Sequence, residues 1–527
     1  MTLALAELWQ IPILLKCNVR PGTKADDPMR QLVFLLLALV VIPAFVPASL
    51  AVTSTTDIEN RILRAITFVE NNYHSSAVVS GYLHDQNGSV MRAYTEDNAL
   101  VALALSSFQE THFSTSHYVD LQRAARFVAA AQAPDGDFYQ YYDFGNGTWK
   151  SSGKFYYWNS LVFMSVAYAA FTVTSQINSE NGFWSPIVDR LSLCLDVWLP
   201  VSLNGDGGVV FAFPNGVRGT DVRYQGALLM GLMYVAAFEY YWGRKDIAER
   251  FAGYARLMAT WLNSLQERDR SRWGNGGFYS NASMNLQPSE ENAFAMFGLN
   301  SYYKGIGLLI PSQRTELDGM RNMMQQWEEG YVENITDSYG GVSFGRDANG
   351  PIPYPRLTWT TSATLAATVD VWINLGPAKY WNDSSRIYAW LTGSDERSTD
   401  MQTPQGNFYE GPVDGRQLRP SDLATTMLAL YSIIRAAFVR IPGTYPVSVS
   451  NPPRFTRTSS STNLVTTEPT ISITQETSAA LANFSLYAVV GLVVVIGVFA
   501  GLYAFKSRTK KKRKRSRIRR SASKKTR

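Results

Sequence analysis

The chain has 527 residues, with 46% hydrophobic and 13% aromatic side chains, two cysteines, four histidines and a formal net charge of +6. The two cysteines, Cys17 and Cys194, exclude a small disulfide-built scaffold, and the absence of paired His or Cys spacing favours neither a metal site nor a bound cofactor. The last 22 residues hold 14 Lys and Arg, whereas residues 52–505 hold 31 basic and 40 acidic residues, a net charge near −9. The basic pI therefore does not indicate a nucleic-acid partner.

The first 51 residues are predicted to be a signal-peptide region. Met29 and Arg30 precede an apolar run at 32–42, and small residues follow at 47–51. A positive start, a short apolar segment and small residues at a cleavage site are typical of a secretory signal. Met29 is the expected natural start, and an uncleaved N-terminal anchor is the alternative.

Residues 52–442 repeat one pattern six times, a glycine–aromatic loop followed by an apolar helix rich in small residues. The loops are Gly81-Tyr82, Gly136-Asp137-Phe138, Gly207-Gly208-Val209, Gly276-Gly277-Phe278-Tyr279, Gly340-Gly341-Val342 and Gly406-Asn407-Phe408-Tyr409. The helices are expected to begin near Ala99, Ser160, Ala227, Ala293, Ala363 and Ala424, at spacings of 61, 67, 66, 70 and 61 residues. Spacing this regular indicates one structural unit used repeatedly.

Each unit is expected to be a helical hairpin. The segment before the first loop, residues 57–73, has apolar side chains along one stripe, as in a helix that buries one face. The segment after that loop, residues 98–105, is apolar nearly all round, as in a helix buried on every side. Six inner helices ringed by six outer helices would form an all-α, closed (α/α)6 toroid.

The C-terminal part predicts a surface anchor. Residues 443–484 form an expected Ser/Thr/Pro-rich stalk, with Ser or Thr at 15 of the 31 positions 448–478. Residues 485–505 are uncharged and long enough to cross a bilayer once as a helix. The basic tail, 506–527, is expected in the cytoplasm beside anionic lipids, which places the toroid outside the cell membrane.

Six Asn-x-Ser/Thr sequons lie on the expected outer side and predict a glycosylated ectodomain. They are at Asn87, Asn146, Asn281, Asn334, Asn382 and Asn483.

Polar residues recur at the expected starts of the inner helices, and in a toroid these six points surround one opening. The acids there are the catalytic candidates: Glu96, Asp97, Asp221, Glu291 and Asp422. Two carboxylates across a sugar can supply a general acid and a base or nucleophile. The expected pair joins an acid among Glu96, Asp97, Glu290 and Glu291 to one among Asp221, Asp347 and Asp422. The alternative at each position is helix capping, because Asp, Asn, Ser and Thr are preferred caps.

Aromatic and basic residues beside these acids favour carbohydrate as the ligand. Sugar rings stack on aromatic faces and form hydrogen bonds with carboxylates, amides and arginine. The expected substrate-binding residues are Tyr141, Trp158, Asn159, Arg223, Tyr224, Arg356, Trp359 and Tyr409. Packing against the neighbouring hairpin is the alternative for the loop aromatics.

The sixfold pattern of Asp-Gly or Gly-Gly plus an aromatic before an inner helix resembles the six-hairpin glycosidase superfamily over about residues 57–440. The resemblance implies an (α/α)6 barrel that hydrolyses, phosphorolyses or epimerises sugars, or cleaves uronic-acid chains by elimination, with Asp and Glu at the funnel. A glycoside hydrolase is the expected activity, and a non-catalytic glycan-binding or cell-envelope protein is the alternative. Residues 132–138 also resemble the Gln-x-x-Asp-Gly-x-Trp repeat of terpene cyclases, but Phe138 replaces the tryptophan and the motif occurs once.

Overall fold

The computed structural model describes most of the repeat region. The described residues are 55–84, 91–112, 115–177, 180–280, 285–309, 316–353, 355–375, 381–393, 400–411 and 421–439. The chain divides into two units, Met1–Pro452 and Pro453–Arg527, and all described residues belong to the first. The predicted signal region, stalk, membrane helix and basic tail lie outside the described residues. Within the described ranges, no helix has both the length and the hydropathy that crossing a membrane requires.

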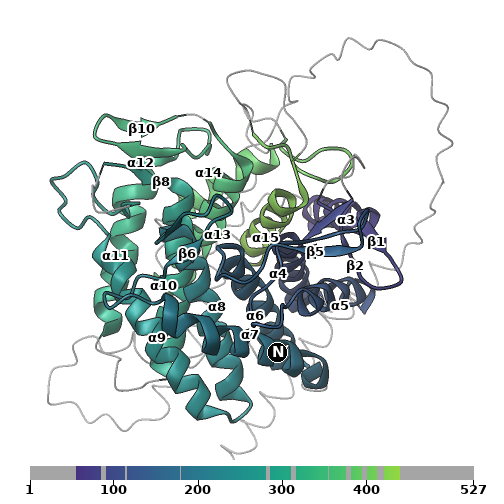
Figure 1. Ribbon diagram of the computed structural model, residues 1–527. Coiled ribbons are helices and arrows are strands. Elements are labelled where there is room, and N and C mark those ends of the chain that lie inside the picture. The colour runs from purple at the N-terminus through teal and green to yellow at the C-terminus, as the bar shows by residue number, and fades with distance from the viewer. Residues whose placement is uncertain are drawn as a thin grey trace, which may run out of the picture. The chain divides into compact units, whose positions relative to one another are not determined.

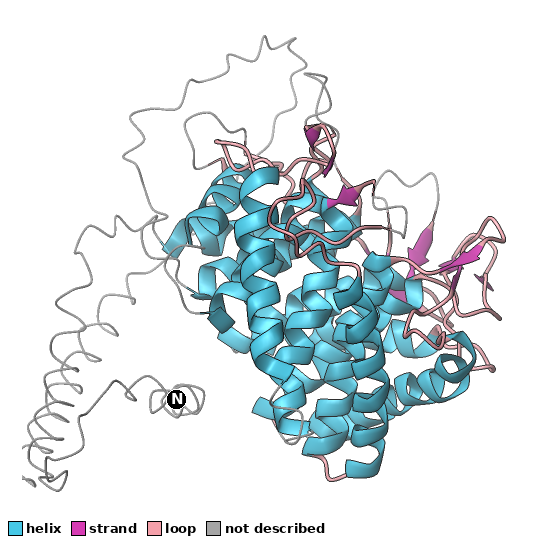
Figure 2. Cartoon of the chain, turned by 90° about the vertical axis from the view of Figure 1, so that its left-hand side faces the viewer, coloured by secondary structure: helices cyan, strands magenta, loops and turns pink. Residues whose placement is uncertain are grey.

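Six inner helices form a closed ring. Figures 1 and 2 show the helices from two sides. The inner helices are α4 (Thr95–His112), α6 (Trp158–Gln176), α8 (Val222–Tyr241), α10 (Ser289–Leu309), α13 (Thr358–Leu375) and α15 (Leu423–Val439). Each packs on the next in this order, and α15 packs on α4. Small residues permit the close approach, since a Cβ added at Gly226 of α8 would overlap the backbone of α10 at Phe294. The closed toroid that the repeat predicts is confirmed.

Six outer helices surround this ring. They are α3 (Thr55–Asn71), α5 (Thr115–Ala130), α7 (Asn181–Ser202), α9 (Lys245–Ser264), α11 (Glu316–Trp327) and α14 (Trp381–Thr392), and α11 continues into the π-helical turn η4 (Glu328–Val332) and α12 (Glu333–Ile335). The outer helices are amphipathic: in α9, Ala248, Phe251, Ala252 and Ala255 are buried while the opposite face is exposed. The inner helix α6, by contrast, is buried along almost its whole surface.

Short antiparallel strands lie in the described connections from an outer helix to the next inner helix. They are β1 (Tyr73–Ser75), β2 (Ser80–Tyr82), β3 (Arg92–Tyr94), β4 (Tyr141–Asp143), β5 (Thr148–Lys150), β6 (Phe211–Ala212), β7 (Arg218–Gly219), β8 (Gln287–Pro288), β9 (Gly345–Asp347) and β10 (Gly350–Ile352). They pair as β1-β2, β3-β4-β5, β6-β7 and β8-β9-β10. Figure 2 shows the strands and long loops gathered mainly at one end of the helices. We call this end, where the six inner helices begin, the mouth.

Each glycine loop lies within its hairpin, between the outer and the inner helix, and contacts the outer helix of the next hairpin. Gly207 and Gly340 have φ of +96° and +89°, and a Cβ at either would overlap the backbone of the following outer helix, α9 or α14. Gly406 has φ of +100°, and its Cβ would overlap the carbonyl of Arg64 in α3. Gln402 Nε2 also donates to Arg61 O of α3 at 2.8 Å. The sixth loop therefore contacts the first outer helix, which closes the ring.

Polar residues in the first turn of four inner helices hold the preceding loops. The loop N–H groups of Tyr82, Phe138, Val209 and Phe278 donate to Asn98 Oδ1, Asn159 Oδ1, Gln225 Oε1 and Asn292 Oδ1, at 2.9, 3.2, 2.7 and 2.7 Å. Buried loop N–H groups need such partners, because an unpaired buried donor is costly. Part of the recurring polar pattern therefore holds the loops and does not contact a ligand.

Two of the predicted glycosylation sites can be placed with their side chains. Asn146 is exposed in the turn between β4 and β5, and Asn334 is exposed on α12. Asn87, Asn281 and Asn483, together with the side chain of Asn382, lie outside the described residues. Glycosylation stays a prediction at all six.

Candidate active site

The first turn of α4 contributes two adjacent acids to the mouth. Glu96 is half-buried, and its Oε2 is buried without a hydrogen-bond partner among the described residues. Burial raises the pKa of Glu96 to about 8; the negative charge of Asp97 adds to the shift, and the positive charge of His84 opposes it. Glu96 is therefore protonated at neutral pH, which is the state that a general acid requires.

His84 is bound to the second of these acids. Its Nδ1 lies 2.7 Å from Oδ2 of the buried Asp97. This hydrogen bond raises the pKa of His84 to about 9, although burial of the ring opposes the shift. Burial raises the pKa of Asp97, and its hydrogen bond to His84 opposes that shift. Because the pKa of His84 is about 9, the imidazole is protonated at neutral pH, and we assign Nδ1–H as the donor to the Asp97 carboxylate.

A second cluster joins three other inner helices at the mouth. Glu290 of α10 accepts through Oε1 from Arg223 Nη1 of α8 at 2.8 Å and from Trp359 Nε1 of α13 at 2.7 Å. The guanidinium of Arg223 lies over the ring of Tyr224, 4.0 Å from its centroid. Three predicted substrate-binding residues, Arg223, Tyr224 and Trp359, thus meet around one carboxylate.

Two further predicted catalytic acids lie beside this cluster. Asp221 caps α8, and its Oδ1 accepts from the N–H groups of Arg223 and Tyr224 at 2.9 and 3.2 Å. Asp221 therefore acts as a helix cap, which was the alternative to a catalytic role. Burial raises the pKa of Glu291 to about 7, and the negative charge of Asp221 adds to the shift.

The two clusters share one electrostatic field across the mouth. The charge of Arg223, on α8, lowers the pKa of Glu96 on α4, although α6 lies between these helices in the ring. The charge of Asp422, before α15, raises the pKa of both Glu96 and His84. Tyr157, before α6, responds to Glu96 and Arg223 as well, and burial is the main cause that raises its pKa to about 12. Groups from distant parts of the sequence therefore lie close enough at the mouth to change one another's pKa.

The remaining facing acids have local partners. Asp422 accepts from Thr425 N at 2.8 Å and so caps the first turn of α15, while it still acts on Glu96 through its charge. Asp347 is the last residue of β9, and its Oδ1 accepts from Asn349 N in the turn to β10 at 2.7 Å. Asp422 therefore remains a candidate partner for Glu96, and Asp347 has a turn-stabilising role.

Trp158 and Asn159 have structural roles, which corrects their expected contact with substrate. Both are fully buried. Trp158 Nε1 donates to Phe138 O at 2.8 Å, and its ring stacks on Tyr156 at 4.1 Å between centroids. Asn159 Nδ2 donates to Asp137 Oδ1 at 2.6 Å while its Oδ1 holds the second glycine loop. Neither side chain has a surface left for a sugar.

The other predicted binding residues keep some exposure. Tyr141 of β4 is half-buried, and the guanidinium of Arg92 lies 4.7 Å from its ring centroid. Arg356 forms an ion pair with Asp337 at 2.6 Å. Tyr409 is half-buried and packs against the core. Of these three, Tyr141 lies close to the mouth residues, since its ring is 5.0 Å from that of Tyr94, directly before α4.

Sequence reasoning gave no role to His84 or Tyr94, and it counted Tyr157 only among the aromatic residues of the loops. His84 lies 13 residues before Asp97, and only the path of the chain through β2 and β3 brings the two together. Tyr94 and Tyr157 immediately precede α4 and α6, with Tyr157 as the N-cap of α6. Their position one residue before an inner helix was an available signal for them.

Glu70, His117 and Asp120 form the one cluster among the described residues with a metal-ligand arrangement. Their ligand atoms lie within 4.8 Å of one another. Asp120 Oδ1 already accepts from Tyr82 Oη at 2.9 Å and from Arg123 Nη1 at 2.8 Å. A guanidinium bound to one ligand opposes a second cation there, so this cluster fits an ion network better than a metal site.

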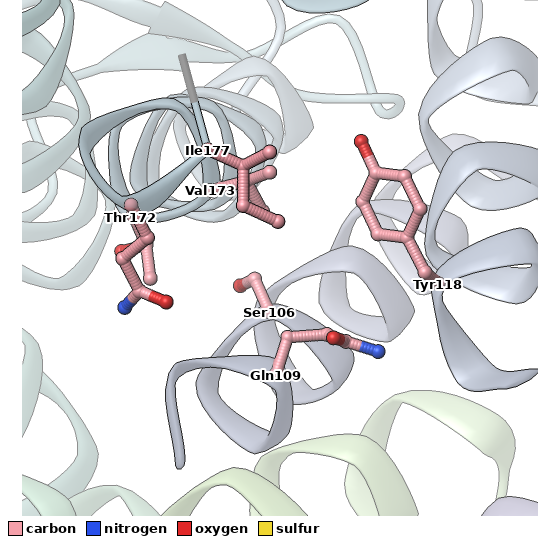
Figure 3. Close-up of a pocket in the computed structure, with 7 residues that line it drawn as sticks. Ser106, Gln109, Tyr118, Thr172, Val173 and Ile177 are labelled. Carbon is pink, nitrogen blue, oxygen red and sulfur yellow. The ribbon is translucent and has the colours of Figure 1, made fainter. Parts of the chain in front are cut away.

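Two cavities lie away from the mouth. The first, shown in Figure 3, is lined by Ser106 and Gln109 of α4, Tyr118 of α5, and Thr172 and Val173 of α6. Its volume of about 10 Å³ suits one water, and Ser106 lies about 15 Å along α4 from Glu96. A second depression of about 290 Å³ is lined by residues of α9, α10 and α11, including Arg256, Tyr302 and Met320.

Comparisons with known proteins match this fold. No protein-family model and no curated protein matches the sequence. The cellobiose 2-epimerase from Bacillus thermoamylovorans B4167 superposes with a TM-score of 0.54 at 10% identity, over 73% of this chain and 100% of that chain. A D-mannose isomerase superposes with 0.53 at 12% identity, over 73% and 98%. This chain therefore shares the (α/α)6 toroid fold of these proteins.

A third solved structure is an inactive variant of the alpha-1,6-mannanase GH76A of Salegentibacter sp. HEL1_6, in which two adjacent aspartates are replaced by asparagine. It is in complex with alpha-1,6-mannotriose and superposes with a TM-score of 0.51 at 11% identity, over 73% of this chain and 100% of that chain. The toroid of this chain therefore spans nearly the whole of each compared protein. At this level of identity the likeness shows the fold, and activity must be argued from the mouth.

Proposed function

We propose that this protein is a glycoside hydrolase that cleaves oligo- or polysaccharide by paired carboxylates at the mouth. The observation that carries the proposal is Glu96, a half-buried acid whose pKa of about 8 keeps it protonated and whose Oε2 has no described partner. A raised carboxyl pKa in a site with other titratable groups is typical of acid–base catalysis.

The chemistry assigns one role to each of two acids. Glu96 gives its proton to the glycosidic oxygen as the bond from that oxygen to the anomeric carbon breaks. Asp422, before the neighbouring helix α15, serves as the base that takes a proton from the attacking water, or as the nucleophile whose sugar ester water then cleaves. General acid catalysis by a positioned side chain supplies about 10²- to 10⁴-fold in rate.

The second cluster suits the binding of a sugar chain. Arg223, Glu290 and Trp359 combine a cation, a carboxylate and an aromatic ring within hydrogen-bond distance of one another. Tyr157 and Tyr224 add two further rings, 4.6 Å apart. The mannanase neighbour binds alpha-1,6-mannotriose, so alpha-linked mannosides are the first substrates to try. The anchoring of the toroid outside a cell membrane by residues 485–505 is part of the same proposal.

The alternative is a glycan-binding protein that has the mouth and lacks turnover. The paired clusters fit this role too, because Asp221 and Asp422 both cap helices. A hydrolase and a glycan-binding protein would both bind the sugar, but only the hydrolase would release a product.

The test is release of reducing ends from a panel of oligosaccharides that includes alpha-1,6-mannotriose, with the full-length chain. The wild type should turn over at least one sugar, and Glu96→Gln should lower kcat at least about 100-fold. Glu59→Gln, at an exposed position on the outer helix α3, is the matched control and should keep full activity. Binding without product would favour the glycan-binding alternative, and full activity of Glu96→Gln would reject Glu96 as the acid.

A further inference from the structure

We propose that His84 is the charged hydrogen-bond donor of the mouth, which binds a sugar oxygen through Nε2 while Asp97 holds its ring in place. The inference rests on the proposed function, because it requires that the mouth binds carbohydrate. It adds a ligand contact that the sequence did not indicate.

The backbone of His84 is fixed on two sides. Its N–H donates to Arg92 O of β3 at 3.0 Å, and its carbonyl accepts from Leu423 N of α15 at 3.3 Å. These bonds join the connection after β2 to the first and sixth inner-helix units. His84 therefore has a defined position next to Glu96 and Asp422 and is not on a free loop.

The imidazole ring is fixed on one side and open on the other. Nδ1 is bound to Asp97 Oδ2 at 2.7 Å, and the ring packs on Tyr94 with 4.8 Å between centroids. The side chain is 38% exposed, and no second hydrogen bond to the ring occurs among the described residues. Nε2 is thus available to a ligand, in an arrangement where a carboxylate orients an imidazole as in Asp–His pairs of enzymes.

The surrounding charges keep the ring protonated. Asp97 and Glu96 act from α4, Asp422 acts from the start of α15, and Tyr94 is the ring that packs on it from β3. Together with the bond to Asp97 these charges raise the pKa of His84 to about 9. At neutral pH both ring nitrogens therefore carry a proton, and Nε2–H can donate only to an acceptor such as a sugar hydroxyl or ring oxygen.

A charged donor of this kind discriminates between sugars. A site built to bind a particular oxygen loses affinity strongly for an analogue that lacks it. Hydrogen bonds to charged groups correspond to roughly 10- to 100-fold in affinity. We expect the sugar at this position to present an oxygen to His84, and its deoxy analogue to bind correspondingly more weakly.

Calorimetric titration of the full-length protein with alpha-1,6-mannotriose, and with any panel sugar that binds, tests the inference. His84→Gln should weaken binding about 10-fold or more at pH 7, and between pH 8 and pH 10 wild-type affinity should fall more steeply than that of His84→Gln, in which only Glu96 titrates. His74→Gln, on β1 with its ring against Phe144, is the matched control and should bind as the wild type does.

Three other results would overturn the inference. Equal affinity of the wild type and His84→Gln would reject His84 as a contact and leave the proposed function standing. An imidazole NMR signal for His84 that titrates near its ordinary value of 6.5, or that does not move in Asp97→Asn, would reject the charged pair. Failure of the wild type to bind any sugar would reject the proposed function, and the inference with it.

Discussion

Gly406→Ala tests whether the toroid is held closed by contact between its sixth loop and its first outer helix. Gly406 has φ of +100°, and a Cβ at this position would overlap the carbonyl oxygen of Arg64 in α3. Two separate costs follow. Alanine disfavours a positive φ by about 1–2 kcal/mol, and the loop must also move away from α3.

The cost of moving the loop away from α3 is specific to the contact that closes the ring, whereas the cost of a positive φ would arise at any such glycine. Displacing packed backbone to admit a methyl group costs about 1–3 kcal/mol. The two costs together give a loss of about 2–5 kcal/mol, which for a domain of this size lowers Tm by about 2–6 °C. Gly216→Ala is the matched control, because Gly216 has φ of +81° and no atom within 4 Å of an added Cβ. It should lose only the first 1–2 kcal/mol.

Thermal unfolding followed by circular dichroism, with urea titration for the free energies, measures both variants. If Gly406→Ala and Gly216→Ala lose the same stability, the contact with α3 contributes nothing measurable and the reasoning about closure fails. Loss of the closure contact should also disturb the mouth, because Asp422 and His84 lie on opposite sides of the same junction between units six and one.

Three further predictions concern the mouth. Asp221→Ala should lose about 1 kcal/mol by urea titration because it removes the α8 cap, whereas Asp221→Asn should lose less than half of that. Since the pKa of His84 is about 9 when folded and 6.5 ordinarily, stabilisation by its pair with Asp97 is complete below pH 6.5 and is lost as the pH rises through 9. Urea titrations at pH 6 and pH 10 should differ through this pair by up to about 1 kcal/mol, because the ring is partly exposed, and His84→Gln should remove that difference. Arg223→Met should raise the pKa of Glu96, because the charge of Arg223 lowers it, and should move the alkaline limb of kcat/KM to higher pH; an unmoved limb would separate the two clusters.

The repeat predicted the ring because each loop glycine is required by the backbone conformation and packing of its own unit, which the local sequence shows directly. Only glycine adopts a positive φ without strain while its backbone touches the next helix, so Gly207, Gly340 and Gly406 had to recur at unit spacing. The meeting of Glu96 with Arg223 and Asp422 followed from the same ring. Once six helices start around one opening, acids at those starts are placed near each other.

The direction of individual side chains could not be predicted in the same way. Trp158 and Asn159 stand at the start of α6, as Glu96 and Asp97 do on α4, but they point into the wall and hold the second glycine loop. Asn159 holds its loop as Asn98 does on α4, so the position on α6 that corresponds to Glu96 is Tyr157. His84 was missed for a related reason, because its contact with Asp97 depends on where β2 and β3 lie relative to each other.

The most direct test of the central claim is a crystal structure of the full-length Glu96→Gln protein soaked with the sugar that the wild type turns over. The account predicts a sugar at the mouth, with a glycosidic oxygen within hydrogen-bond distance of residue 96, Asp422 on the far side of the scissile bond, and a ring against Trp359 or Tyr224. A sugar bound instead in the depression lined by Arg256, Tyr302 and Met320, with the mouth empty, would contradict it.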